Sequence, residues 1–207
     1  MESKFCIPTK QEVDFLEKHF HSLDVLEFYS KGKYISLIDR FPRSLTEDEI
    51  EREPLSYSRD WEPSAKEKQK YLLDEKKFLR FFSSIYHFHK KNNVFVYCRD
   101  FADININDFR YLEDTNTQNM AVEGLSYLKE SSQGVLKTSD LATLEVFVKL
   151  TLREAIYCNF FFIDSLSVLI GYYEMSFLLY CNDPETLKKY EDFAIESNLF
   201  SRKPNIG

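Results

Sequence analysis

The hydrophobic pattern of the chain is densest between Asn159 and Phe200. Three short, almost wholly apolar runs are separated by the turn residues Asp164-Ser165 and by Gly171; the runs are 159–163, 166–170 and 176–181. Such runs are typical of adjacent strands, and runs that are apolar on both faces indicate a sheet covered from both sides. Asp183-Pro184 then starts a helix that ends near Ser197. The stretch therefore predicts a three-strand meander followed by a helix.

Capping boxes predict three helix starts earlier in the chain. They begin at Thr9, Thr46 and Ser64, each with a Glu three residues later. The third opens the longest predicted helix, with an apolar stripe from Tyr71 to Tyr86 at helical spacing and an end at Asn92-Asn93.

The middle of the chain predicts two further helices. Residues 99–119 are polar and rich in acids, which favours a loop, and a short helix follows over 120–129. Ser139 is the expected cap of another helix, whose apolar face runs from Leu141 to Ala155 and leads into the meander.

Three other segments are predicted to be strands. Residues 94–98 are a continuous apolar run, and residues 25–29 and 34–38 flank Gly32 as a β-hairpin would. The hairpin either extends the sheet or forms a small N-terminal lobe. We therefore predict one α+β domain over 1–207, with a mixed or antiparallel sheet of about five to six strands and helices on its faces. The alternative is a lobe over 1–55 and a main lobe over 64–200, joined by a loop at 55–63.

The composition of the chain indicates its cellular compartment and the distribution of its charge. No apolar run approaches the roughly 20 residues of a membrane span, and the N-terminus lacks the apolar core of a signal peptide. The four cysteines have no paired spacing, so we expect reduced, buried thiols and a cytoplasmic protein. The net charge is −7 over 207 residues, yet residues 66–91 carry eight basic and three acidic side chains. The remainder is therefore more acidic than the total indicates.

The sequence offers no recognisable catalytic motif. A nucleophile elbow, a phosphate-binding glycine loop, a dinucleotide fingerprint and a His-Glu-x-x-His motif are all missing, which counts against the common enzyme classes. We predict no catalytic residue, no metal and no cofactor.

Two alternative functions remain open. A metal-dependent hydrolase or nuclease would use Asp100, Asp103 and Asp108 with a His-Phe-His pair, either 19–21 or 87–89. A nucleic-acid-binding protein would use the basic helix 66–91, whose aromatics would stack on bases. The acidic pI near 5.2 weighs against the second.

The last third of the chain has a family resemblance. A capped helix leads into Phe160-Phe161-Phe162-Ile163-Asp164, a hairpin passes through Val168-Leu169-Ile170, a strand reaches Tyr180 and Asp183-Pro184-Glu185-Thr186-Leu187 starts a helix. This order resembles bacterial immunity proteins of polymorphic or contact-dependent growth-inhibition toxins. The resemblance covers about 65 residues and implies a non-catalytic inhibitor that binds a cognate protein toxin.

The predicted partner-binding residues are acidic and aromatic, because an acidic inhibitor is steered toward a basic partner and exposed aromatics anchor interfaces. They are Glu47, Asp48, Glu49, Glu51, Asp100, Asp103, Asp108, Glu113, Asp114, Tyr172, Tyr173 and Glu174. The partner's identity, the oligomeric state and the biological process are not encoded in any motif.

Overall fold

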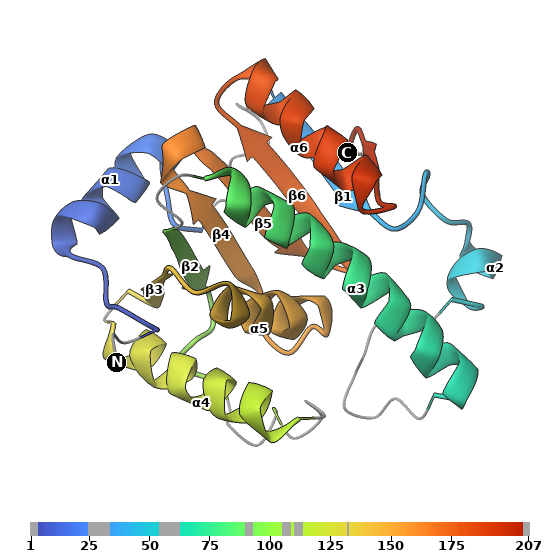
Figure 1. Cartoon of the computed structure of the whole chain (residues 1–207), viewed down its shortest axis with the longest axis horizontal. Helices are drawn as coiled ribbons and strands as arrows, with labels where there is room; N and C mark the ends of the chain where they lie inside the picture. The colour runs from blue at the N-terminus through green and yellow to red at the C-terminus, as the bar shows by residue number, and fades with distance from the viewer. Residues whose placement is uncertain are drawn as a thin grey trace.

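Seven strands of the described residues pair into one sheet in the computed structural model (Figure 1). The structure describes residues 4–24, 34–53, 63–89, 93–104, 109, 114–131 and 133–204. The strands are β1 (Tyr34–Asp39), β2 (Val94–Cys98), β3 (Val135–Thr138), β4 (Cys158–Phe162), β5 (Ser167–Tyr172), β6 (Ser176–Cys181) and β7 (Phe200–Arg202). Their order is β3-β2-β4-β5-β6-β1-β7, and every neighbouring pair is antiparallel.

This architecture confirms the predicted α+β class and exceeds the predicted number of strands. The two strands that the pattern missed, β3 and β7, are four and three residues long and lie at the two edges of the sheet. Runs this short contain too few positions for an alternation to emerge from the sequence. Edge position also relaxes the demand for apolar residues on both faces.

The predicted meander is confirmed as β4, β5 and β6, with two corrections to its bounds. β4 starts one residue earlier than expected, at Cys158, and β5 continues through Gly171 to Tyr172. Gly171 is therefore not the turn. A Cβ at this position would lie 2.3 Å from the Thr151 side chain, so glycine allows the closest approach between strand and helix instead.

The helices begin where their caps predict in most cases. They are α1 (Lys10–Phe20), α2 (Glu47–Ile50), α3 (Ala65–Phe88), α4 (Thr115–Glu130), α5 (Leu141–Leu152) and α6 (Pro184–Glu196). The capping boxes at Thr9, Thr46 and Ser64 are all formed, and Asp183 caps α6 by accepting the Thr186 N–H. None of the helices in the described ranges combines the length and hydropathy that a membrane crossing requires.

Three helix boundaries were predicted wrongly. α4 begins at Thr115 inside the expected loop, because the Asp114 side chain accepts the N–H of Thr117 and caps it. α5 is capped by Asp140 rather than Ser139. α3 ends at Phe88, before the Asn92-Asn93 stop that the sequence suggests.

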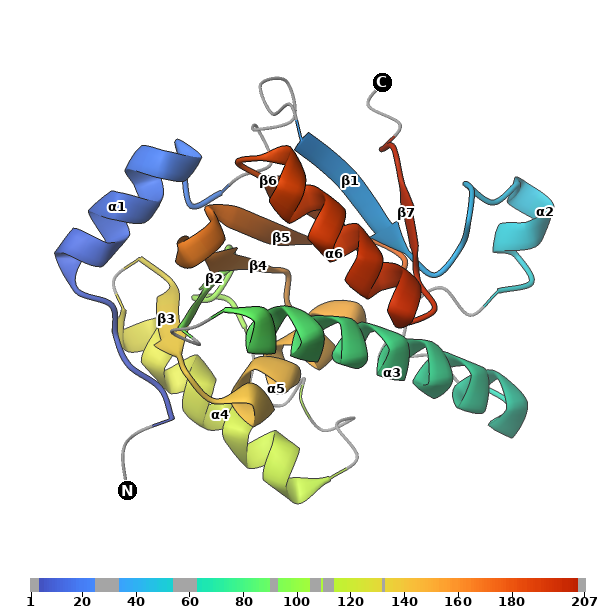
Figure 2. The ribbon, with the colours of Figure 1, turned by 45° about the horizontal axis from the view of Figure 1, so that its top comes forward.

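The two faces of the sheet are covered by different helices. Figure 1 shows α3, α5 and α6 lying in front of the sheet, and Figure 2 shows α3 and α6 running side by side over it. On this face the ring of Phe160 lies 5.0 Å from that of Phe82 of α3. On the opposite face Phe161 packs 4.9 Å from Phe20 of α1. Neighbouring residues of β4 thus enter two separate cores, as runs apolar on both faces predict.

The first half of the chain contributes β1 to the same sheet. β1 pairs with β6 through Leu37↔Leu178 and with β7 through Leu37↔Arg202, so this strand extends the sheet rather than standing apart from it. The expected partner strand 25–29, the Gly32 turn and residues 55–62 of the predicted linker lie outside the described residues.

Candidate protein-binding surface

The turn between β5 and β6 holds an unusual backbone. Glu174 and Met175 are consecutive non-glycine residues with φ of 61° and 57°, in the left-handed region that side chains disfavour. Each such residue costs about 1–2 kcal/mol, so neighbouring contacts must hold the turn. The Met175 side chain is fully buried, and the Ser176 hydroxyl donates to the carbonyl of Tyr173 at 2.7 Å. The turn is therefore held by the buried Met175 side chain and by the hydrogen bond between Ser176 and Tyr173.

A second strained loop supports the first. Glu154, between α5 and β4, also has a positive φ of 55°, and its carboxylate accepts the Glu174 N–H at 3.0 Å. The residue before it, Arg153, forms a two-point ion pair with Glu75 of α3 in the interior, at 2.7 and 3.0 Å. Strain in an over-determined structure is often found at functional sites, and here it occurs in two loops that contact each other.

Three tyrosines gather on these loops. The rings of Tyr157 and Tyr173 are 5.4 Å apart at 63°, and those of Tyr172 and Tyr173 are 5.4 Å apart at 68°. Tyr172 is 40% exposed and Tyr173 is 60% exposed, which is high for side chains of this size. Burial raises the pKa of Tyr157, and the neighbouring Glu154 carboxylate adds to this. Its hydroxyl therefore stays a hydrogen-bond donor at any physiological pH.

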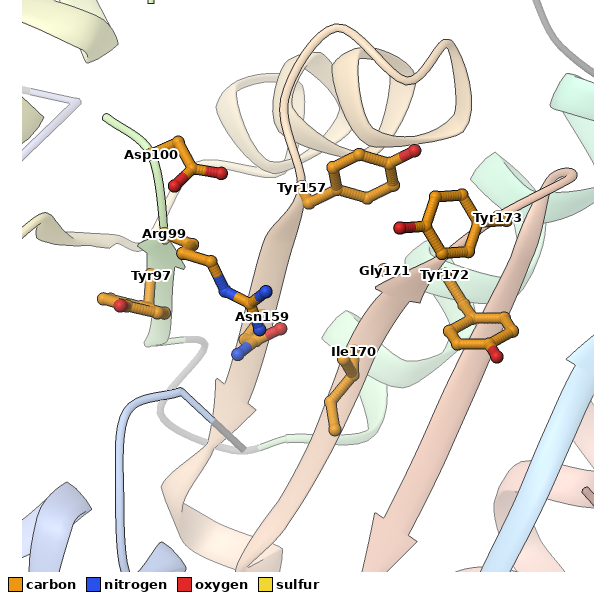
Figure 3. Close-up of a pocket in the computed structure, with 9 residues that line it drawn as sticks. All are labelled: Tyr97, Arg99, Asp100, Tyr157, Asn159, Ile170, Gly171, Tyr172 and Tyr173. Atoms are coloured by element: carbon orange, nitrogen blue, oxygen red, sulfur yellow. The ribbon is translucent and has the colours of Figure 1, made fainter. Parts of the chain in front are cut away.

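A pocket of about 70 Å³ lies on one side of the tyrosines (Figure 3). Tyr157 and Tyr173 border it on one side, and Arg99 and Asp100, which follow β2, border it on the other. Asn159 lies between them, with its side-chain amide donating to the carbonyl of Leu23 at 2.9 Å. The pocket thus combines aromatic walls with polar groups at its rim.

A shallower pocket of about 340 Å³ lies on the other side of Tyr172 and Tyr173. It extends from the β5–β6 turn across the end of β1 to Ile50 of α2. Arg202 and Arg43 line it, and each is held in an ion pair: Arg202 with Asp39 at 2.6 Å and Arg43 with Glu49 at 2.6 Å. We call the two pockets together with Tyr157, Tyr172, Tyr173 and Glu174 the tyrosine surface.

The acidic helix of the sequence analysis borders this surface, but one of its residues has a local role. Glu49 closes the capping box of α2 and pairs with Arg43, and the Arg43 guanidinium lowers the pKa of Glu49 to about 2. Glu47 and Asp48 are exposed on the same short helix, and Glu51 is exposed at its C-cap. The structure therefore brings α2 and the β5–β6 turn to one end of the sheet.

The acidic loop after β2 is divided. Asp100 borders the smaller pocket, whereas Asp103 is exposed in the turn after β2. Asp114 is the cap of α4, and its hydrogen bonds with Thr117 lower the pKa of that carboxyl. Asp108 and Glu113 lie outside the described residues.

The histidine pairs do not converge. His87 is exposed, with its Nδ1 2.7 Å from the Ser83 carbonyl, whereas His89 is buried, with its Nε2 2.6 Å from the Tyr190 hydroxyl. The His19 ring packs against Phe15 of its own helix. Within the described ranges no group of three His, Cys, Asp or Glu side chains is placed to hold a metal ion.

The basic helix buries most of its aromatics, although Phe88 at its end is exposed. Tyr71 and Phe81 of α3 are fully buried and Tyr86 is 8% exposed, so none can stack on a base. Of the four cysteines, Cys98, Cys158 and Cys181 are buried as predicted, but Cys6 is exposed. Cys6 forms an isolated bridge with Lys137 of β3, the strand at one edge of the sheet.

Sequence reasoning found the β5–β6 tyrosines and missed the groups around them. Tyr157 and Arg99 carry no local signal, because they come together only through the pairing of β2 with β4, which cannot be read from the chain. The sequence did hint at Asn159, because it is a polar residue at the start of an apolar run.

Comparison of the chain with protein-family models, with curated proteins and with solved structures finds no match.

Proposed function

We propose that this chain is a non-catalytic protein-binding module, and in its most specific form a cytoplasmic immunity protein that neutralises a cognate toxin. The observation that carries the proposal is the exposure of Tyr172 and Tyr173 on a fixed, strained turn between two pockets. Tyrosine is enriched at interface hot spots because it offers a large contact area with few rotamers to immobilise.

The surroundings support binding rather than chemistry. The two pockets are lined by tyrosines, by arginines held in ion pairs and by apolar side chains. Such groups suit recognition of a protein through buried contact area, ring stacking and charge. The acidic balance of the chain would accelerate association with a basic partner.

The test uses candidate toxin domains from the neighbouring genes, each mixed with the purified protein and analysed by gel filtration. We expect a complex, and we expect the double variant Tyr172→Ala, Tyr173→Ala to weaken it about 30-fold or more, since hot-spot truncations cost at least about 2 kcal/mol. The matched control is Ile195→Ala on α6, where the side chain is 62% exposed. This control should leave the affinity unchanged.

Two results would contradict the proposal. The first is the lack of any complex with these candidate toxin domains. The second is a complex whose affinity is the same for the wild type and the double tyrosine variant, with circular dichroism showing that the variant is folded.

A further inference from the structure

In the described part of the chain, the tyrosine surface has more carboxylates without an ion-pair partner than arginines without one. Its three arginines are each neutralised inside the chain: Arg99 pairs with Asp24, Arg43 with Glu49 and Arg202 with Asp39. An arginine held by its own carboxylate offers little net charge to a partner.

Three further carboxylates on or next to this surface differ from Asp39 and Glu49, which are the ion-pair partners of Arg202 and Arg43. Among the described residues, Asp100, Glu154 and Glu174 have no cation within ion-pair distance, and the one hydrogen bond that links Glu154 and Glu174 comes from a backbone N–H. Asp100 and Glu174 are exposed and Glu154 is half-buried. The surface therefore presents net negative charge beside aromatic rings.

This combination selects for a cation of a particular shape. The face of a tyrosine ring attracts a cation electrostatically. A carboxylate at the rim can accept a charge-assisted hydrogen bond from the same cation. The smaller pocket, at about 70 Å³, is far below the roughly 300 Å³ of the smallest usual cofactor sites and suits one side chain. A guanidinium is planar, weakly hydrated and able to stack, whereas an ammonium is a strongly hydrated point charge.

We propose that the tyrosine surface binds an arginine side chain of the protein partner, whose guanidinium enters the smaller pocket between Tyr157, Tyr173 and Asp100. This inference rests on the proposed function, because it names the chemistry of the partner that the same surface receives. The Asp100 carboxylate accepts from the guanidinium, the Tyr173 ring stacks on its plane, and Glu174 adds negative charge at the outer rim.

The first experiment needs no identified partner. The blocked peptide Arg-Gly-Arg-Gly-Arg, its lysine analogue and its glutamate analogue are titrated into the ¹⁵N-labelled full chain and followed by NMR. We expect the arginine peptide to shift the amide signals of residues 99–100 and 171–174, the lysine peptide to bind more weakly and the glutamate peptide not to bind. Shifts spread over all acidic parts of the chain, or equal binding of the arginine and lysine peptides, would overturn the proposal.

Matched variants separate a specific site from general acidity. Asp100→Asn should weaken binding of the arginine peptide about fivefold, the loss expected for one charge-assisted contact at a partly exposed site. Glu123→Gln, which removes the same charge from an exposed position of α4, should not. Tyr173→Phe should retain binding because the ring face remains, and Tyr173→Leu should lose most of it. Equal effects of Asp100→Asn and Glu123→Gln would overturn the proposal.

The toxin complex distinguishes failure of this inference from failure of the proposed function. If the complex requires Tyr172 and Tyr173 but is unaffected by Asp100→Asn and Glu174→Gln together, the arginine proposal is wrong and the binding module stands. If the complex weakens with both sets, both are supported.

Discussion

The ion pair between Glu75 and Arg153 gives the sharpest test of how the tyrosine surface is held. Glu75 lies on α3 and Arg153 follows α5, directly before the strained residue Glu154. Nε of Arg153 is 2.7 Å from Glu75 Oε2 and Nη2 is 3.0 Å from Oε1, and each side chain is 5% exposed. Both carboxylate oxygens are thus bound by a single guanidinium in the interior.

The change Arg153→Met keeps most of the apolar stem and removes the charge. Glu75 is then a buried carboxylate without its ion-pair partner, and breaking a buried pair in this way costs about 3–5 kcal/mol. That is a large part of the roughly 5–15 kcal/mol that stabilises a typical domain. The double variant Glu75→Leu, Arg153→Met should recover most of the loss, because no charge is left buried alone.

The assay is urea unfolding followed by far-UV circular dichroism, with the slope of the transition checked for constancy. The control is Lys188→Met, which removes an ion pair at the surface: the Lys188 side chain is 67% exposed and that of its partner Asp192 is 43% exposed. We expect little change in the urea midpoint of this variant. A loss below about 1 kcal/mol for Arg153→Met would refute the reasoning. So would a double variant that is no more stable than the single one.

Two further predictions concern buried groups. Burial lowers the pKa of His89, with Asp164 acting in the opposite direction, so the folded state favours the neutral imidazole. The contribution of neutral His89 to the free energy of unfolding should be fully present above the unfolded pKa of about 6.5 and should be lost as the pH falls below it. The urea midpoint should therefore decline from about pH 7.5 to about pH 5.5, and His89→Gln should flatten this decline. An equal pH dependence of the midpoint in both proteins would contradict this prediction. In native protein iodoacetamide should modify Cys6 alone, because the other three thiols are buried. Mass spectrometry of peptides checks this, and rapid labelling of Cys98 without unfolding would show that the core opens.

The sequence by itself determined the features that depend on near neighbours. Each capping box needs only a hydroxyl and a carboxylate three residues apart, so the starts of α1, α2 and α3 could be predicted. The almost wholly apolar run 159–163 likewise predicted a strand covered on both faces, because a continuous apolar run is read from adjacent residues. Tyr172 and Tyr173 were found for the same reason, as aromatics at a turn between two strands.

Tertiary structure determined the features for which two neighbouring residues were equally suitable, or for which the contacting residues are far apart in the sequence. Ser139 and Asp140 are both good caps; Asp140 accepts the Thr143 N–H, while the Ser139 carbonyl accepts the Tyr86 hydroxyl from α3. Asp74 and Glu75 belong to the charged segment 66–91, yet both are buried against arginines from distant parts of the chain, Arg40 and Arg153.

The tyrosine surface combines both kinds of information. Its exposed rings come from one turn of the chain, but Tyr157 and Asp100 reach them only through the pairing of β2, β4 and β5. Strand pairing is set by contacts between segments tens of residues apart, whose free energy depends on the whole core and not on any short pattern. The sequence therefore determined what the turn displays, and the sheet determined which residues surround it.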